Sequence, residues 1–400
     1  MNARQEVWIT GVGLITCLGE GLEANWQHLA NGDPPVYDDK SFAPYVVHPL
    51  APINFDKQIP KKSDQRQMEP WQRIGVYAAG LALGDAGISG KSDLLDVTDM
   101  IVAAGGGERD ISVDTAILAE ARKRNDAGSF LNERLMNDLR PTLFLAQLPN
   151  LLAGNISIVH GVVGSSRTFL GEESAGVDAV RIAHARIAAG QSELTLVGGA
   201  YNGARWDVLL IFEQAGALLK GGFSPIGDRG AGGGMALGNM GAFLVLESRK
   251  HAEARGARAH ARLRTVRSDR VARETGEIEA TLRRQWEGIA AEVDRERAAV
   301  ISGASGLEPA TSAEHSVLKH IGLPIRSTGT YIGHGVEAQF LANLAIACAA
   351  IDHGKLYPAG GPADAGAGPP DLSQVVVTAV ANWRGEGLAL IERVDRRNQR

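Results

Sequence analysis

Residues 168–190 have the layout of a nucleophile elbow, in which a strand, a sharp turn and a helix present one reactive side chain. A short extended stretch enters a turn at Gly171, and a helix rich in small residues leaves it. An apolar run at residues 194–200 then forms a buried strand that contains Gly198 and Gly199. The turn carries Glu173 and Ser174. Because a carboxylate is a weak and strongly solvated nucleophile, the pattern predicts an elbow without a nucleophile.

The two cysteines of the chain lie away from this turn. Cys17 follows the first predicted strand, and Cys348 lies in an apolar helical run. Two cysteines exclude a disulfide framework and a cysteine-based metal site, and free cysteines in apolar helices usually serve packing. We expect no metal and no cofactor.

The composition indicates a large soluble protein. With 44% hydrophobic residues among 400, the chain can build two domains or one duplicated fold. The net charge of −5, without a long block of like charge, favours neither nucleic acid nor an anionic membrane as a partner. The first residues lack the features of a secretory signal, and no apolar run approaches the roughly 18 residues of a membrane span. We therefore expect a cytoplasmic protein.

Strands and helices alternate along the chain, which is typical of an α/β fold with buried sheets. The first set of strands is predicted at residues 7–13, 100–104, 194–197 and 242–247, with helices at 22–30, 71–86, 116–124 and 174–189. A second set of strands is predicted at residues 261–266, 298–303, 324–327, 375–381 and 388–393. The two sets resemble each other in order, which indicates a duplication. We place the boundary near Arg255, between halves 1–255 and 256–400.

Several segments resemble β-ketoacyl-acyl-carrier-protein synthases, the condensing enzymes of the thiolase superfamily. The matching segments lie at residues 7–19, 148–161, 168–200, 238–247 and 327–338, and they cover nearly the whole chain in the family's order. The resemblance implies a thiolase-like, duplicated fold of five αβαβα layers. The elbow would belong to the first half, and the histidine loops to the second.

In that family a cysteine at the start of a helix takes the acyl group, and two histidines help decarboxylate the malonyl extender. Counted back from the glycine pair, the cysteine position holds Glu173. The first histidine position, within residues 300–309, holds Ser305, and the second histidine is retained as His334. A supporting lysine five residues before the second histidine reads Gly329.

The family's Gly-Phe-Gly-rich loop, which supplies an oxyanion N–H and a gating phenylalanine, corresponds to residues 381–388. This stretch is shortened, with Arg384 near the gate position and Glu386 in place of an aromatic residue. Four of the five catalytic parts are therefore altered, which predicts that the chain cannot run ordinary condensation alone. Chain-length-factor-like subunits of the same family lose the cysteine and pair with an active ketosynthase, although glutamine is a common replacement there.

The resemblance thus favours a non-condensing subunit of acyl chain elongation, in a specialised fatty-acid, polyene or polyketide pathway. Its partners would be an acyl carrier protein and a cysteine-bearing ketosynthase, as a heterodimer, or a second copy as a homodimer. Two alternatives stay open. In the first, the chain would decarboxylate malonyl carrier protein with His334. In the second, it would condense with an unassigned nucleophile.

Three interpretations concern the side chains at the elbow. A buried Glu173 needs a partner, which is either Arg384 in a salt bridge or else His334, another arginine or water. His334 is either a relic held by hydrogen bonds or a working residue. Ser174 is better explained as a helix-capping residue than as the nucleophile of a hydrolase.

Two surface regions are candidates for contact with partners. Lys61, Lys62, Arg66 and Arg73 resemble the family's carrier-docking region, and the alternative is a solvated helix face. Phe144 and Gln147 lie where the family sends side chains across the dimer interface toward the partner's acyl tunnel, or they simply pack there. An edge strand near residues 165–169 would pair with its dyad mate in a dimer.

Overall fold

The computed structural model describes residues 4–138 and 147–394 of the chain. Its main element is an 11-stranded mixed sheet with the order β11-β10-β12-β13-β9-β1-β8-β6-β4-β5, to which β2 is added beside β1. A separate two-stranded sheet joins β3 to β7. The chain is therefore an α/β protein, as predicted.

The main sheet consists of two halves with the same internal plan. The first half contains β1 (Val7–Thr16), β4 (Asp99–Ala104), β5 (Ser166–Leu170), β6 (Leu194–Tyr201) and β8 (Met240–Ser248). Strand β4 runs parallel to β5 and β6, and β8 runs antiparallel to β6 and β1. From the edge inward, the four strand pairings β5–β4, β4–β6, β6–β8 and β8–β1 are parallel, parallel, antiparallel and antiparallel.

The second half repeats this pattern strand by strand. It contains β9 (Ala261–Asp269), β10 (Ala298–Ser302), β11 (Ile325–Ser327), β12 (Gln374–Val380) and β13 (Glu386–Glu392). Strand β10 is parallel to β11 and β12, and β13 is antiparallel to β12 and β9. The halves meet where β1 and β9 pair antiparallel, with Val7 opposite Leu263. Equal order and direction are what a duplication predicts.

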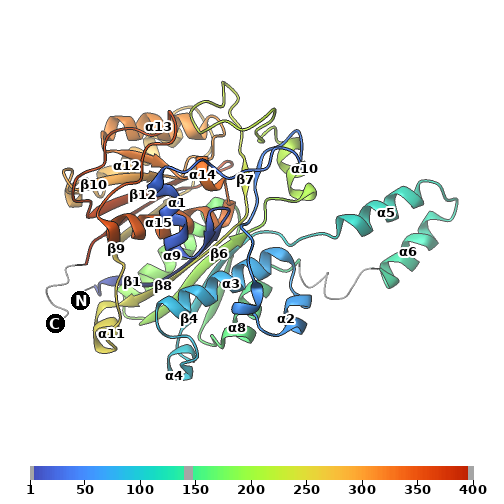
Figure 1. Cartoon of the computed structure of the whole chain (residues 1–400), viewed down its shortest axis with the longest axis horizontal. Helices are drawn as coiled ribbons and strands as arrows, with labels where there is room; N and C mark the ends of the chain where they lie inside the picture. Colours follow the sequence, from blue (N-terminus) through green and yellow to red (C-terminus); the bar gives the residue numbers. More distant parts are fainter. Residues whose placement is uncertain (1–3, 139–146, 395–400) are drawn as a thin grey trace.

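Helices cover both faces of each half and produce five layers (Figure 1). Helices α9 (Glu173–Ala188) and α15 (Gln339–His353) lie between the halves and share one hydrophobic core with both. Helices α3 (Pro70–Asp85) and α8 (Leu151–His160) cover the outer face of the first half. Helices α12 (Glu277–Glu287) and α13 (Ala310–Ile321) cover the outer face of the second.

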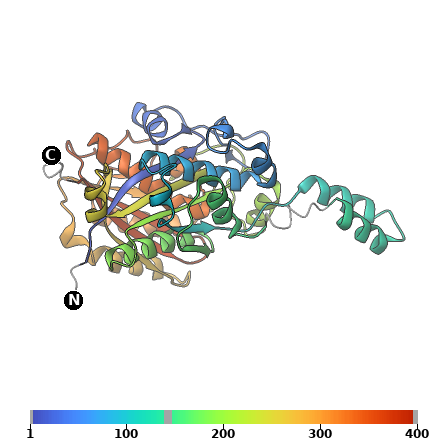
Figure 2. The same cartoon turned by 90° about the horizontal axis from the view of Figure 1, so that it is seen from below.

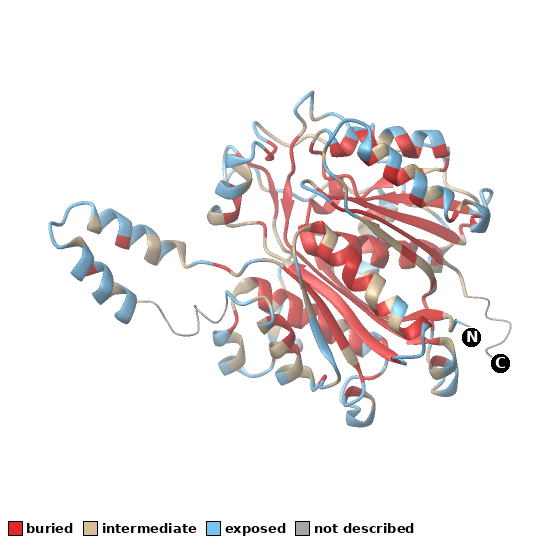
Figure 3. Ribbon diagram, turned by 180° about the vertical axis from the view of Figure 1, so that it is seen from behind, coloured by how far each residue is buried: buried red, intermediate tan, exposed pale blue. Residues whose placement is uncertain are grey.

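Alternation along the strands explains why both faces are buried. In β8, Ala242 and Leu244 point into the central core, while Phe243 and Val245 pack under α3 and α8. The whole strand is buried, as in other sheets covered by helices on both sides. Figure 3 shows the same distribution, with buried strands in the middle of the molecule and exposed residues on the outer helices.

Shorter elements complete the structure. They are β2 (Gly19–Glu20), α1 (Leu22–Asn31), β3 (Val47–His48), η1 (Phe55–Lys57), α2 (Lys62–Gln67), α4 (Ser92–Leu95), α10 (Trp206–Gln214), β7 (Leu237–Gly238), α11 (Arg249–Ala254), η2 (Ala290–Glu292), α14 (Gly329–Ile332) and η3 (Val336–Ala338). Helix α11 ends one residue before the predicted boundary at Arg255. The boundary itself stays a prediction, because the halves share the central core.

Helices α5 (Ile111–Ala121) and α6 (Ala127–Asn137) form a hairpin that projects from the body (Figures 1 and 2). We call residues 109–138 the arm. Helix α5 starts five residues before the predicted position 116, because the Asp110 carboxylate accepts a hydrogen bond from the Val113 N–H and caps the helix.

Within the part of the chain that the structure describes, no helix is both long enough and apolar enough to cross a bilayer.

Candidate functional site

The elbow forms where β5 ends and α9 begins. Gly171 has φ +149°, a backbone conformation that favours glycine, and Glu172 is the N-cap residue. Helix α9 then starts at Glu173, one residue earlier than predicted. A side chain at Gly176 would place its Cβ 2.3 Å from the Glu337 carbonyl oxygen. The small residues of the helix therefore allow close packing of the elbow against the loop that carries His334.

The side chains of Glu173 and His334 form a buried hydrogen-bonded pair. Their exposed fractions are 5% and 2%, and His334 Nε2 lies 3.0 Å from Glu173 Oε1. The backbone N–H of Asn382 donates to the same oxygen at 3.2 Å. Because a carboxylate accepts hydrogen bonds, the His334 tautomer that fits this contact carries its proton on Nε2.

Two opposing effects act on the Glu173 carboxyl. Burial raises its pKa, but the hydrogen bond and charge of His334, with the N–H groups of Glu173 and Asn382, bring it below the ordinary value. Glu173 is therefore an ionised carboxylate whose charge is held by neighbouring donors. Among the described contacts, Glu173 Oε2 and His334 Nδ1 are without a hydrogen-bond partner.

The predicted salt bridge between Glu173 and Arg384 is wrong. Among the described residues no ion pair joins them, because Glu173 turns inward to His334 while Arg384 lies on the exposed side of the elbow. Arg384 instead lines a pocket of about 360 Å³ with Leu170, Gly171, Glu172, Ser174, Arg270 and Trp383. Burial and the Glu173 charge raise the pKa of Glu172 to about 7, and Arg384 acts in the opposite direction.

Ser305, which the resemblance places at the first histidine position, is buried and forms hydrogen bonds within its own loop and to Arg229. Its Oγ accepts a hydrogen bond from the Leu307 N–H at 3.2 Å, and its carbonyl oxygen accepts one from Arg229 Nη1 at 2.9 Å. A hydroxyl held in this way does not replace an imidazole in stabilising an enolate.

The lysine position has no space for a side chain. A Cβ on Gly329 would lie 2.7 Å from Ile226 Cδ1 and 2.9 Å from the Ala304 carbonyl oxygen. Ile226, Ala304 and Ala363 form a small buried cluster there. Apolar packing therefore fills the space around Gly329.

The shortened loop at residues 381–388 packs on the elbow. The Ala381 N–H donates to the Gly385 carbonyl oxygen at 2.8 Å, and a Cβ on Gly385 would lie 2.6 Å from the Ser174 Cβ. Glu386 begins β13 and pairs with Arg273 at 2.6 Å, so its carboxylate has a structural role. In the described structure, no hydrogen bond connects Ser174 to His334, which leaves a serine hydrolase without its base.

Neither cysteine serves as a nucleophile in this structure. Burial raises the pKa of Cys17 to about 12, and its Sγ donates to the Tyr331 carbonyl oxygen at 3.2 Å. Burial also raises the pKa of Cys348 well above the usual range. Both thiols remain protonated at neutral pH.

Sequence reasoning missed two buried groups behind the elbow. Burial and the charges of Glu173 and Glu172 raise the pKa of Glu337 to about 8, and its Oε2 has no partner among the described groups. Burial and the Glu337 charge also raise the pKa of Tyr201 far above the usual value. Nothing in the local pattern marks Glu337, because it lies on η3 after Val336, which takes the unusual φ of 41°.

Three of the four predicted docking residues share a pocket of about 400 Å³. Lys62, Arg66 and Arg73 line it with Gln65, Met68 and Glu69, whereas Lys61 precedes α2. Lys62 pairs with Asp56 at 2.5 Å, and the Arg73 guanidinium lies 5.8 Å from the centre of the Phe55 ring. Arg66 is exposed.

The predicted tunnel residues are only partly within the structure. Phe144 lies outside the described residues, and Gln147 is exposed. The edge strand is β5, one residue further along than predicted, and it pairs only with β4 among the described strands. The described residues contain no group of three or more His, Cys, Asp or Glu side chains arranged to hold a metal ion.

The duplicated layers and the elbow define a protein of the thiolase-like fold. The family model "Beta-ketoacyl synthase, N-terminal domain" matches residues 4–252, and the chain belongs to this family.

Two curated relatives illustrate the range of similarity. The 3-oxoacyl-[acyl-carrier-protein] synthase 2 of Rhizobium meliloti is 27% identical over 278 residues, which are 64% of this chain and 62% of that protein. The oxytetracycline polyketide β-ketoacyl synthase 1 of Streptomyces rimosus is 24% identical over 382 residues, 89% of this chain and 87% of that protein. The match to the first of these relatives thus spans less than two thirds of its length.

Two solved structures share the fold. A β-ketoacyl synthase from Burkholderia phymatum STM815 has a TM-score of 0.80 at 22% identity, covering 98% of this chain and 100% of that one. The ishigamide ketosynthase/chain length factor has a TM-score of 0.79 at 20% identity, with 98% and 100% covered. The predicted thiolase-like fold is confirmed.

Proposed function

We propose that this chain is a non-condensing, chain-length-factor-like subunit that assists a cysteine-bearing ketosynthase in extending acyl chains on a carrier protein. The observation that supports this most directly is the buried Glu173–His334 pair. By the resemblance, Glu173 stands at the position of the nucleophile. Its carboxylate also takes the hydrogen bond of His334, the histidine that the chain retains.

The chemistry of the pair argues against condensation. Acyl transfer to a carboxylate would create a mixed anhydride, and the ionised Glu173 is held by His334 and the Asn382 N–H rather than directed at a substrate. His334 donates Nε2–H to this carboxylate, so the same proton is not available for a thioester oxygen. Ser305 and Gly329 supply no substitute.

Several surface features support a protein partner. Strand β5 ends the sheet and has one edge without a strand among the described residues. Near the end of this strand the side chain of Leu170 is exposed, and helix α10 exposes Trp206, Leu210 and Ile211. Exposed apolar side chains of this size are typical of an interface.

The test of this function combines purification with a chemical assay. The isolated chain, incubated with octanoyl and malonyl carrier protein, should carry no acyl adduct by intact mass and should form no β-ketoacyl product. Co-expression with the cysteine-bearing ketosynthases of its source should yield a stable 1:1 complex with one of them. A covalent acyl-protein on the isolated chain, followed by extension by two carbons, would refute the proposal.

A second candidate is decarboxylation of malonyl carrier protein by His334. The retained imidazole favours it, but the contact of Nε2 with Glu173 opposes it. Carbon dioxide release by the isolated chain that disappears in His334→Ala would establish this activity instead.

The carrier protein is proposed to dock at the pocket of Lys62, Arg66 and Arg73. The double variant Lys62→Glu/Arg66→Glu should weaken carrier binding about tenfold at low salt, because two attractive charges become repulsive. The control variant Lys91→Glu/Lys319→Glu changes the net charge equally at two exposed lysines elsewhere. Equal affinity of both variants for the carrier protein would exclude this pocket as the docking site.

A further inference from the structure

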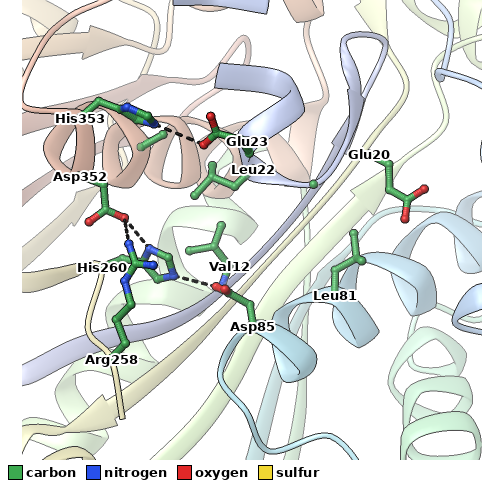
Figure 4. A pocket seen from close by; sticks show the side chains of 12 residues that line it. Val12, Glu20, Leu22, Glu23, Leu81, Asp85, Arg258, His260, Asp352 and His353 are labelled. Carbon is green, nitrogen blue, oxygen red and sulfur yellow. Dashed lines mark hydrogen bonds and ion pairs between the residues drawn. The ribbon is translucent and has the colours of Figure 1, made fainter. Parts of the chain in front are cut away.

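The pocket in Figure 4 lies at the end of α15 that is remote from the elbow. Helix α15 begins shortly after His334, and its 15 residues span roughly 20 Å before the helix ends at His353. The pocket has a volume of about 510 Å³, which is enough for a small organic molecule. None of the described residues that line it belongs to the elbow or to residues 381–388.

Apolar side chains line the middle of this pocket. Val12 comes from β1, Leu22 from α1 and Leu81 from α3. Leu81 and Asp85 are four residues apart on α3 and therefore face the same side of that helix. Figure 4 shows Leu81 between the carboxylates of Asp85 and Glu20. An aliphatic chain can therefore lie along the pocket, between charged groups.

Carboxylates outnumber the basic groups around the pocket. The charged and titratable side chains that line it are Glu20, Glu23, Asp85, Asp352, Arg258, His260 and His353. Burial lowers the pKa of His260, but Asp352 and Asp85 raise it to about 9, so its imidazole is charged at neutral pH. Even when His353 also carries a proton, the lining keeps an excess of negative charge.

The positive groups are already paired with carboxylates of the same pocket. His260 Nδ1 lies 2.8 Å from Asp352 Oδ2, and its Nε2 lies 2.7 Å from Asp85 Oδ2. Arg258 Nη2 donates to the same Asp352 oxygen at 3.1 Å. An anionic ligand would have to compete for these groups, and it would bring a further negative charge to a lining that is already acidic.

The carboxylates, in contrast, can accept further hydrogen bonds. Asp85 receives the Val12 N–H and the His260 ring at Oδ2, so its Oδ1 has no hydrogen-bond partner among the described residues. The Asp85 side chain is 39% exposed. On the other side of the pocket, Glu23 contacts His353, and 66% of the Glu23 side chain is exposed. The lining therefore offers acceptors and needs a positively charged donor.

We propose that this pocket is a binding site for a small aliphatic primary amine. The ammonium group donates to Asp85 Oδ1 within the field of Glu23, and the carbon chain lies against Leu22 and Leu81. A protonated primary amine has three N–H donors and one positive charge, which are what the lining needs. The site is separate from the elbow, so it stands or falls independently of the proposed function.

The first test compares three probes on the full chain by ligand-observed NMR titration at constant ionic strength. Hexylammonium has the charge, the carbon chain and the N–H donors, and it should bind with a Kd of about 1 mM or tighter. Hexyltrimethylammonium keeps the charge and the chain but has no N–H donor, so it should bind at least tenfold more weakly. Hexanoate reverses the charge and should not bind at these concentrations.

The second test locates the site with variants. Asp85→Asn removes the charge of the main acceptor and should weaken hexylammonium binding at least tenfold. Glu23→Gln removes the opposite charge and should weaken it about threefold. The matched control is Glu296→Gln, which makes the same change of charge at an exposed position elsewhere and should alter the affinity less than twofold.

The two tests decide the proposal together. Asp85→Asn also removes a contact of His260, so Glu23→Gln, whose side chain is mostly exposed, decides the location if Asp85→Asn does not fold. The proposal is overturned if hexylammonium does not bind at about 10 mM, or if hexanoate binds equally well. It is also overturned if Glu23→Gln and the Glu296→Gln control bind hexylammonium with the same affinity.

Discussion

At the scale of single residues, the elbow is characterised by the direction and the contacts of one side chain. Glu173 points into the protein, is ionised, and is held by His334 and the Asn382 N–H. Its second oxygen, Oε2, and the Oε2 atom of the buried Glu337 are without hydrogen-bond partners among the described groups. Buried polar atoms without partners are rare in folded proteins, so these two carboxylate oxygens mark an unusual environment behind the elbow.

The first residue-scale prediction concerns Glu173→Cys. This variant should stay at the background rate of condensation, because Ser305 replaces the first histidine and Ile226 fills the space beside Gly329. The variant would also lose the Glu173 carboxylate, which now orients the His334 ring through a hydrogen bond. The measurement is β-ketoacyl product from octanoyl and malonyl carrier protein, and a rate within tenfold of an active ketosynthase would contradict the multiple-loss argument.

The second residue-scale prediction concerns the pH dependence of Glu337. Its pKa is raised to about 8 in the folded chain, mainly by burial, so the native state keeps a proton that the unfolded chain releases. The resulting stability is fully present below the unfolded pKa and is lost as pH rises through the folded pKa. Between pH 5 and 8, this one group should lower the unfolding free energy by up to about 1.4 kcal/mol per pH unit.

Glu337→Gln, which imitates the protonated carboxyl, should remove that decline, while Glu296→Gln at an exposed position should leave it unchanged. Urea unfolding at a series of pH values measures both variants. An identical pH profile for Glu337→Gln and the wild type would show that Glu337 ionises freely.

At the scale of elements, the junction of the two half-sheets depends on a charged histidine. His260 precedes β9, and its two ring nitrogens contact Asp85 Oδ2 at 2.7 Å and Asp352 Oδ2 at 2.8 Å (Figure 4). The same Asp85 oxygen accepts the Val12 N–H at 2.8 Å. One imidazolium therefore connects α3, β9 and α15 beside the β1–β9 pairing, at the wall of a pocket of about 510 Å³.

The element-scale prediction is that His260→Gln destabilises the fold. Burial lowers the pKa of His260, but the two carboxylates outweigh it and raise the pKa to about 9. Its contribution is complete below the ordinary pKa of 6.5 and is lost as pH rises through 9. Since Asp85 is 39% exposed, we expect a loss of about 2 kcal/mol at pH 6, less than for a fully buried pair.

His353→Gln is the matched control in the same pocket. His353 contacts Glu23 at 3.3 Å, and the Glu23 side chain is 66% exposed, so the lost ion pair should cost less than about 0.5 kcal/mol. The imidazole also stacks on the Trp26 ring, and losing this contact should cost up to about 1 kcal/mol at both pH values. Denaturant unfolding at pH 6 and pH 10 compares the two variants. An equal loss of stability at pH 6 and pH 10 for His260→Gln would refute a role for the charged imidazolium.

At the scale of the whole molecule, the central layer is shared by two halves of equal plan. Helix α9 comes from the first half and α15 from the second, and both belong to one hydrophobic core. Neither half has an independent core on its inner side.

The whole-molecule prediction is that residues 256–400 do not fold alone. Without α9 and the first half-sheet, this fragment would expose its side of the central core and should show no cooperative unfolding transition. Co-expression with residues 1–255 should restore a folded, two-piece protein. A cooperative transition of the isolated fragment would mean that the predicted boundary at Arg255 separates independent domains.

Much of the fold could be predicted because local patterns determine it. Apolar runs located the strands of both halves, and helical periodicity located α1, α3, α5 and α9 of the first half, since buried strands and amphipathic helices leave a periodic signal. The elbow was visible from Gly171, the small-residue helix and the strand with its paired glycines. The assignment of Glu173, Ser305 and Gly329 to three catalytic positions of the family likewise came from the sequence.

The partners of those residues were decided only by the tertiary structure. Whether Glu173 faces Arg384 or His334 depends on the path of the loop at residues 381–388, which local sequence does not encode. Glu337 and the partly buried Tyr201 became neighbours because η3 packs against β6. The arm stands clear of the body, since its described residues share no hydrophobic core with it. Periodicity reports how a segment folds, whereas a contact between distant segments depends on how the layers meet.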